Sequence, residues 1–503
     1  MRTKKIAGRA GAAAAAVLLL LAVCALPAAA QDELARRGSY IYTQDGKDVP
    51  IPDVYTSDGS VVLRDGDGTA ANEPQDMSLF PDGTFVVADT GNSRLLLVSP
   101  DGTQTALTSF SLPDGTSTSL SQPEGVTVCD DGAMLVADTD NGRILRLDRT
   151  GAVLREYPRP ANMLGLGEDD AYLPTKVDED GYGRLYIVAR NVNRGILCLD
   201  PDGVFVGYIG APRVVPDLIE LLWRRVSTKA QLAQMTQYVS TEYDNLCVDD
   251  KNFVWGTIGA LDAADIKAAV AGHDLSGQVT PVTRINAGDS DVLHRTGSYA
   301  PLGDLRFEKE QSVIVDIALG TGGTYSLLDR QRGRVFTYDS NGELLFAFGG
   351  MGDQRGGLHA PTALLYDGDR LCILDRTSGT IERYRPTAHG SLILQAVTAQ
   401  YTGDLTQSYA LWSEVARQSS NFEYAFIGMG RVCMNEKDYT QAMAYFRYAN
   451  DTSGYSEAFE QLRKQRLSVA FPYIFWTLAA GAVVLIAAKL VRRIVRYIRG
   501  EED

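Results

Sequence analysis

Histidine is scarce in this chain, which has four in 503 residues: His273, His294, His359 and His389. No Ser/His/Asp or Cys/His arrangement for nucleophilic catalysis can be recognised around them. The scarcity also limits metal chemistry, because histidine is the commonest metal ligand in proteins. The composition therefore does not favour an enzyme.

Cysteine is also sparse, and none of the six cysteines forms a C-x-x-C pair. Five remain once the N-terminal leader is set aside, each in an apolar context: Cys129, Cys198, Cys247, Cys372 and Cys433. An odd number of isolated cysteines favours buried small hydrophobic residues over disulfides or metal ligands.

Positive charge is the third shortage, since the formal net charge is −15. Residues 1–30 carry four positive charges and residues 489–503 a net +2, which leaves about −21 for the remainder. Such a surface is well solvated and binds nucleic acid poorly, so we expect no nucleic-acid partner.

The N-terminus has the pattern of a secretory signal. Basic residues up to Arg9 precede an apolar stretch over residues 12–26, and Ala28, Ala29 and Ala30 supply the small residues of a cleavage site. We predict a signal peptide over residues 1–30; the alternative is an uncleaved signal anchor.

A second apolar segment lies near the C-terminus, where residues 469–488 contain no charge. Twenty apolar residues are enough to cross the hydrocarbon core of a bilayer. Lys489 and four arginines follow, and the positive-inside rule places them in the cytoplasm. We predict a transmembrane helix over residues 468–488, a basic cytoplasmic tail over residues 489–503, and a single-pass protein of the cell membrane with its ectodomain outside.

Most of the chain between these segments is repetitive. The stretch Phe85-Val-Val-Ala-Asp89 recurs 49 residues later as Met134-Leu-Val-Ala-Asp138, and each copy is followed by a polar turn and an arginine. Six units align, and their second strands end at Asp89, Asp138, Ala189, Thr257, Asp329 and Asp375. Five positions later stand Arg94, Arg143, Arg194, Asp262, Arg334 and Thr380. Repeats of this length built from short strands predict the blades of a β-propeller.

The repeated pattern (Pro-x-Gly, an apolar strand, D-G, then V-A-D-x-x-N-x-R) resembles the NHL repeat over roughly residues 70–390. The resemblance implies a mainly β protein with a six-bladed propeller over residues 31–390. The Asp and Arg of each turn are interpreted as structural groups that hold the blades together. Residues 138–142 look like a calcium loop, but the glycine comes one place early and Arg149 replaces the required glutamate.

Three further segments are assigned to the propeller. Residues 40–63 are expected to complete the last blade beside residues 381–396, because a closed ring leaves no unpaired edge strand. Helical insertions are predicted near residues 213–240 and 261–311. Insertions fall on loops at a propeller face, where they could contact a partner or simply cover a sheet edge.

Helix-forming sequence replaces the strand pattern over residues 391–467. Tyr439, Ala442, Phe446 and Ala449 resemble the second helix of a tetratricopeptide repeat, and Leu405, Ser408, Trp412 and Val415 stand in the same roles 34 residues earlier. The resemblance implies a small α-helical neck that serves either as a spacer or as a peptide-binding groove.

The residues placed at the mouth of the propeller channel are the candidates for ligand binding: Gln75, Asp76, Glu124, Lys176, Asp244, Asn245 and Asp316. Four carboxylates in this set could surround a divalent cation such as calcium, although Lys176 would lie in the same ring. No catalytic residue and no required cofactor are assigned.

The favoured function is that of a membrane-anchored extracellular binding or scaffold protein that acts through a propeller face. The layout resembles accessory components of bacterial membrane transport systems, which implies a membrane or cell-surface protein partner such as a transporter subunit. The alternative function is a metal-dependent lactone hydrolase or lyase with its site in the channel.

Overall fold

The computed structural model describes residues 38–44, 47–161, 163, 170–192, 194–210, 242–264, 266–267, 281–295 and 311–499. The chain divides into two compact units, residues 1–402 and 403–503. The predicted signal peptide and the insertion predicted near residues 213–240 lie outside the described residues.

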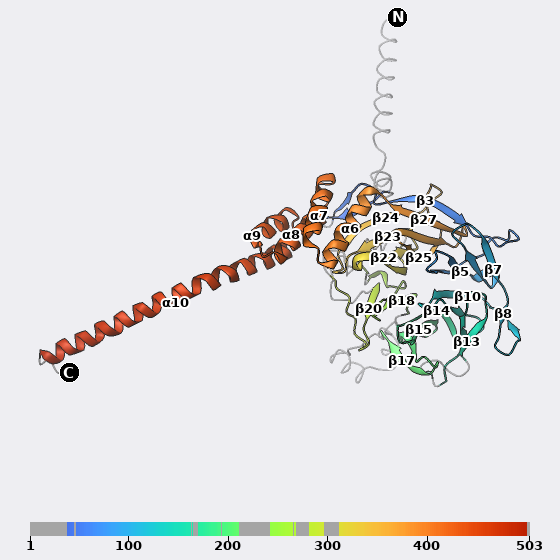
Figure 1. Ribbon diagram of the computed structural model, residues 1–503, viewed down its shortest axis with the longest axis horizontal. Helices are drawn as coiled ribbons and strands as arrows, with labels where there is room; N and C mark the ends of the chain where they lie inside the picture. Colours follow the sequence, from blue (N-terminus) through green and yellow to red (C-terminus); the bar gives the residue numbers. More distant parts are fainter. Residues whose placement is uncertain are drawn as a thin grey trace, which may run out of the picture. The chain divides into compact units, whose positions relative to one another are not determined.

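The first unit is a six-bladed β-propeller, as the repeats predict (Figure 1). Blade one contains β4 (Asp76–Leu79), β5 (Phe85–Asp89), β6 (Arg94–Val98) and β7 (Gln104–Leu107). Blade two contains β10 (Pro123–Val128), β11 (Met134–Asp138), β12 (Arg143–Leu147) and β13 (Val153–Pro158). A short hairpin connects these two blades and consists of β8 (Phe110–Ser111) and β9 (Ser117–Thr118). Blade three contains β14 (Leu173–Glu179), β15 (Leu185–Arg190), β16 (Ile196–Leu199) and β17 (Phe205–Ile209).

The remaining blades differ from this four-stranded plan. Blade four shows β18 (Asn245–Val248), β19 (Val254–Thr257) and β20 (Val282–Ile285). Blade five contains β21 (Ile314–Leu319), β22 (Tyr325–Asp329), β23 (Arg334–Tyr338) and β24 (Leu344–Gly349), extended by β1 (Tyr40–Tyr42) and β2 (Asp48–Pro50). Blade six contains β25 (Pro361–Asp367), β26 (Arg370–Asp375), β27 (Thr380–Pro386) and β3 (Tyr55–Val62).

The ring closes through two features. The innermost strand of each blade contacts that of the next, and β25 of blade six contacts β4 of blade one. The N-terminal strand β3 pairs antiparallel with β27, from Thr380 opposite Val62 to Pro386 opposite Tyr55. The prediction that residues ahead of the first unit complete the last blade is confirmed for β3, whereas β1 pairs with β24 and widens blade five. The partner strand ends at Pro386, so the part of the prediction that extended it to residue 396 is wrong, because residues 388–396 are helical.

Part of the segment predicted as the second insertion belongs to the propeller itself. Residues 263–264 and 266–267 are helical, as the sequence around residue 262 predicts. Strand β20, however, pairs with β19 as the third strand of blade four. The insertion is therefore divided by a strand, which the weak repeat pattern of this unit conceals.

Hydrophobic clusters lie between the faces of neighbouring blades. Leu96 of blade one packs with Cys372 and Ile381 of blade six, and Leu63 fills the same cluster. Strands β5, β11 and β22 are buried along their whole length because both of their faces meet a neighbouring sheet. The five cysteines that follow the predicted signal peptide are free thiols. Four of them are buried and Cys247 is half-buried.

The repeated Asp and Arg anchor the turns of the first two blades. Asp89 accepts hydrogen bonds from the backbone N–H of Asn72 at 2.7 Å and from Arg94 Nε at 2.6 Å. Asp138 accepts the same pair of bonds from Ser121 and Arg143. These groups tie each turn to the loop that enters the same blade.

The link to the next blade comes from the residue after the aspartate. Thr90 Oγ1 donates to the carbonyl of Pro123 at 2.6 Å, and Thr139 Oγ1 donates to that of Pro174 at 2.8 Å. The Asp and Arg of the turn therefore have a structural role, as predicted, but they act within one blade. The hydrogen bond to the next blade is made by threonine.

Helix α6 (Ala388–Thr402) ends the first unit, and the second unit contains α7 (Leu405–Gln418), α8 (Glu423–Asn435), α9 (Tyr439–Tyr448) and α10 (Thr452–Ile498). Consecutive helices of the second unit pack against one another. The tetratricopeptide resemblance stays a prediction. Helix α10 is long and apolar enough to cross a membrane, and its most apolar stretch has no contact that buries it.

Candidate functional site in the propeller channel

Two cavities lie along the propeller channel, and Lys176 on β14 borders both of them. The first, here called the mouth, has a volume of about 380 Å³ and is lined by residues of all six blades. The second, here called the inner cavity, has a volume of about 320 Å³ and is lined mainly by the innermost strands. Charged side chains are concentrated at the mouth.

All seven residues predicted for the channel line one of these cavities. Gln75, Glu124, Lys176 and Asp244 line the mouth. Asp76, Lys176, Asn245 and Asp316 line the inner cavity. The predicted set is therefore divided between two spaces, and a single ring of four carboxylates around one cation is not formed.

The innermost strands deliver these residues through irregular pairing. Four innermost strands have a register shift close to their first residue. The shift lies between Pro123 and Gly125 in β10, Pro174 and Lys176 in β14, Ile314 and Asp316 in β21, and Pro361 and Ala363 in β25. A β-bulge redirects side chains locally. Its effect is visible on β14, where the consecutive residues Thr175 and Lys176 both reach the mouth. On β21, Val315 lines the mouth and Asp316 lines the inner cavity.

The carboxylates of the inner cavity are occupied by hydrogen bonds between blades. Asp76 accepts the backbone N–H of Val126 at 3.0 Å, and Asp178 accepts that of Val248 at 2.7 Å. Asp316 accepts the N–H of Leu364 at 2.5 Å and also the side-chain amide of Asn245. These groups therefore join blades one to two, three to four, four to five and five to six. Ligand binding by Asp76, Asn245 and Asp316 stays a prediction.

Burial changes the acidity of two of these carboxyl groups. It raises the pKa of Asp178 and of Asp316 to about 7, although nearby backbone N–H groups favour the charged forms. The charge of Lys176 also opposes the shift at Asp316. The inner cavity consequently gains negative charge as the pH rises through neutrality.

Lys176 separates the two cavities as a largely buried ammonium group. Its Nζ lies 2.8 Å from Asp76 Oδ1, and both side chains are 12% exposed. Among the described residues, the ammonium group makes no hydrogen bond with good geometry, and its nitrogen is buried.

Sequence reasoning missed three arginines of the mouth: Arg190, Arg330 and Arg376. Each stands one residue after the repeat position of Asp89 and Asp138, where blades one and two carry Thr90 and Thr139. Comparing the six units at this position would have found them. At this position, blades one and two have a threonine that donates a hydrogen bond to the next blade. Blades three, five and six instead have an arginine that lines the channel mouth.

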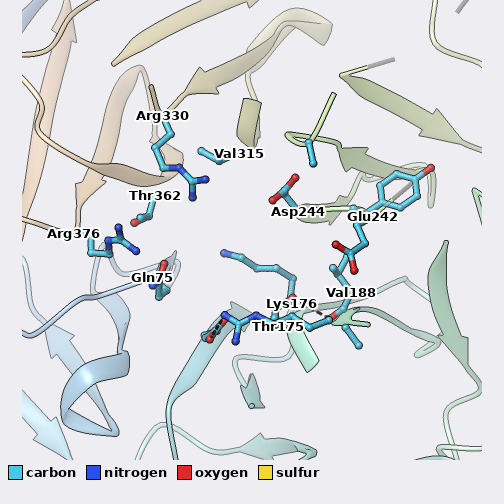
Figure 2. A pocket seen from close by; sticks show the side chains of 15 residues that line it. Gln75, Thr175, Lys176, Val188, Glu242, Asp244, Val315, Arg330, Thr362 and Arg376 are labelled. Carbon is cyan, nitrogen blue, oxygen red and sulfur yellow. Dashed lines mark hydrogen bonds and ion pairs between the residues drawn. The ribbon is translucent and has the colours of Figure 1, made fainter. Parts of the chain in front are cut away.

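The three arginines differ in their partners. Arg190 Nη2 donates to both oxygens of Glu124, at 2.5 and 2.6 Å. Burial raises the pKa of Glu124, and Arg190 opposes that rise. Within the described part of the chain, the guanidinium groups of Arg330 and Arg376 make no hydrogen bond or ion pair, and Figure 2 shows both entering the same side of the mouth.

Acidic residues of blade four stand across the mouth from these arginines (Figure 2). Asp244 accepts the backbone N–H of Gly259 through Oδ2 at 2.5 Å. Partial burial raises the pKa of Asp244, while Gly259 and the positive charge of Arg330 favour its ionised form. Glu242 lies beside it and is exposed to the cavity.

Among the residues that the structure describes, one cluster outside the channel has the spacing of a metal site: Cys129, Asp131 and Glu179. Arg146 already pairs with both carboxylates, with Nη1 2.5 Å from Glu179 and Nη2 2.7 Å from Asp131. Burial raises the pKa of the Cys129 thiol, which opposes formation of the thiolate that a metal would need. The donor set does not favour a metal ion.

Comparison with known proteins adds the repeat family. The NHL repeat matches residues 72–96 and 120–147, which form the first two blades. The chain carries NHL repeats. Both matched blades keep the Asp and Arg of the turn. The comparison with curated proteins finds no match.

Solved structures that match this chain include three proteins with weak similarity. A virginiamycin B lyase from Staphylococcus aureus is 11% identical, with a TM-score of 0.39 over 66% of this chain and 99% of that protein. A gluconolactonase from Xanthomonas campestris is 12% identical, with a TM-score of 0.41 over 69% and 97%. An aldose sugar dehydrogenase from Streptomyces coelicolor is 14% identical, with a TM-score of 0.37 over 66% and 98%. Similarity this weak says nothing about activity.

Proposed function

We propose that this protein is a membrane-anchored binding protein that holds a small charged ligand in the mouth of its propeller, outside the cell. The observation that carries the proposal is the pair Arg330 and Arg376, whose guanidinium groups enter the mouth without an ion pair or hydrogen bond from the described residues. Charged groups that are partly withdrawn from water and left unpaired are unfavourable unless something binds them. A ligand of complementary charge supplies that partner.

The donor groups of the channel favour binding over metal-dependent hydrolysis. Calcium takes six to eight oxygen ligands, and here Asp76 and Asp316 already accept backbone N–H groups. The ammonium group of Lys176 lies within 2.8 Å of Asp76, where a cation would have to bind. These contacts support a site that recognises charge without activating water.

The membrane part of the proposal depends on α10 and on the predicted signal peptide. The unburied apolar stretch of α10 is long enough to cross a bilayer, and the basic residues after it favour a cytoplasmic C-terminus. The propeller then lies on the outer side, where its mouth is open to extracellular solutes.

The ligand-binding proposal predicts stabilisation of the purified full-length chain in detergent by at least one member of a library of small charged molecules. Binding to the native state raises the unfolding temperature by mass action. The double variant Arg330→Gln/Arg376→Gln should lose at least tenfold in affinity for that molecule, because hydrogen bonds to charged groups contribute about 1.5–3 kcal/mol each. Differential scanning fluorimetry and titration calorimetry measure both effects.

The matched control is Arg370→Gln/Arg385→Gln, which removes the same charge from blade six. Both side chains are more than half exposed and pair with Asp58 at the surface. This variant should bind like the wild type. Recovery of the molecule unchanged after prolonged incubation supports binding, whereas its conversion, or the lack of any stabilising molecule, contradicts the proposal.

We further propose that the protein partner is a subunit of a membrane transport system on the same side of the membrane. The support is the predicted layout of signal peptide, propeller, helical segment and single membrane span. Chemical cross-linking in native membranes, followed by mass spectrometry, should join propeller lysines to a permease or solute-binding subunit. Cross-links confined to copies of this chain would contradict the partner assignment.

A further inference from the structure

The mouth carries two opposed charged walls. Of its seven charged side chains, Arg190 and Glu124 neutralise each other and Lys176 pairs with Asp76 below. Arg330 and Arg376 remain on one side and Glu242 and Asp244 on the other (Figure 2). The two walls come from different blades, since the arginines follow β22 and β26 and the acids precede β18.

The arginine wall is suited to a carboxylate. Guanidinium groups present planar pairs of N–H donors that match the two oxygens of a carboxylate. Two such cations on one side of a cavity repel each other, and an anion between them removes that repulsion. Thr362 and Gln75 lie beside them and offer further polar contacts (Figure 2).

The acidic wall is suited to an ammonium group. One oxygen of Asp244 accepts the N–H of Gly259, which fixes the side chain and leaves the other oxygen for a ligand. Glu242 has no hydrogen bond or ion pair among the described residues and adds a second acceptor. An ammonium group donates three hydrogen bonds, which two carboxylates and water can accept.

The size of the mouth selects among molecules that carry both charges. A cavity of 380 Å³ would have a diameter of about 9 Å if it were spherical, and an extended peptide spans about 3.3–3.6 Å per residue. The two termini of a peptide of two or three residues are therefore far enough apart to reach both walls.

We infer that the mouth binds a short zwitterionic peptide of two or three residues, with its C-terminal carboxylate on Arg330 and Arg376 and its N-terminal ammonium on Asp244 and Glu242. This inference rests on the proposed function, because it names the ligand class of the same site.

The test compares three peptides on the full-length chain in detergent by titration calorimetry at neutral pH. Triglycine carries both charges, N-acetyl-triglycine only the carboxylate, and triglycine amide only the ammonium. Triglycine should bind at least tenfold more tightly than either blocked form. In Glu242→Gln/Asp244→Asn, triglycine and N-acetyl-triglycine should bind equally, while Arg370→Gln/Arg385→Gln should retain the wild-type order. The peptide comparison on the wild type needs no variant to fold.

The outcomes separate this inference from the proposed function. If triglycine and one blocked form bind equally, the ligand need not be zwitterionic, and the mouth is a site for a single charge. If no peptide binds but a molecule of the charged library does, the assignment of a peptide ligand is wrong and the proposed binding function stands. If neither the peptides nor the library bind, both proposals fail.

Discussion

Replacing Asp316 with alanine is expected to lower the free energy of unfolding of the propeller by about 3 kcal/mol. The side chain is 4% exposed and accepts hydrogen bonds from the N–H groups of Ile317 and Leu364, at 2.7 and 2.5 Å, and from the amide of Asn245. Alanine leaves three donors from three blades without an acceptor, and each buried unsatisfied donor costs about 1 kcal/mol or more. Denaturant unfolding followed by circular dichroism measures the loss.

The control is Asp353→Ala, whose side chain is 99% exposed and contacts His359 at the surface. A change of less than about 0.5 kcal/mol is expected there. An equally small effect at Asp316 would contradict the assignment of this carboxyl group as a link between blades.

The pH dependence gives a second readout for Asp316. Burial raises its pKa to about 7, above the ordinary value near 4. The native state therefore holds the proton more tightly than the unfolded chain, so this contribution to stability is complete below about pH 4 and is lost as the pH rises through 7. Wild-type stability should decline between about pH 4 and 7. Asp316→Ala should reduce the decline without removing it, because Asp178 titrates in the same range.

The architecture could be predicted because its signals are local and repeated. Asp89 and Asp138 end strands of the same apolar pattern, and the regular spacing identifies blades before any contact is known. Closure by β3 followed from the physical requirement that a ring leaves no free edge. Blade four was described poorly because Thr257 and Asp262 replace the usual Asp and Arg, so its third strand was hidden in a presumed insertion.

The site was predicted only in part, because its chemistry depends on which side chains the channel brings together. Asp76, Asp316 and Lys176 share the inner cavity, whereas Glu124 and Asp244, which were expected in the same ring, line the mouth. Arg330 and Arg376 stand at a repeat position that is a threonine in the clearest units. The arginine wall of the mouth is therefore found where the sequence differs from the repeat, with arginine in place of threonine.

The second large effect is expected in the helical unit, where Trp412→Ala should lower the free energy of unfolding by about 3–5 kcal/mol. Trp412 is completely buried and packs against Phe422 and Tyr424, with ring centroids 6.4 and 5.3 Å apart. Gly428 lets α8 approach its indole, because a Cβ at that position would lie 2.5 Å from Nε1. Truncating a buried tryptophan leaves a cavity that so close a helix contact can fill only partly.

Hydrogen exchange resolves this unit from the propeller in the full-length chain. Amides of α7 and α8 should exchange at least about 100-fold faster in Trp412→Ala, because a loss of about 3 kcal/mol raises the open population by that factor. Phe459→Ala, at a side chain on α10 that is 49% exposed, should leave the rates within a few-fold of wild type. Propeller amides should keep their wild-type rates in both variants, since the two units form separate contact clusters. Faster exchange that spreads through blades one to six would contradict that independence and would mean that the helices contribute to the stability of the binding site.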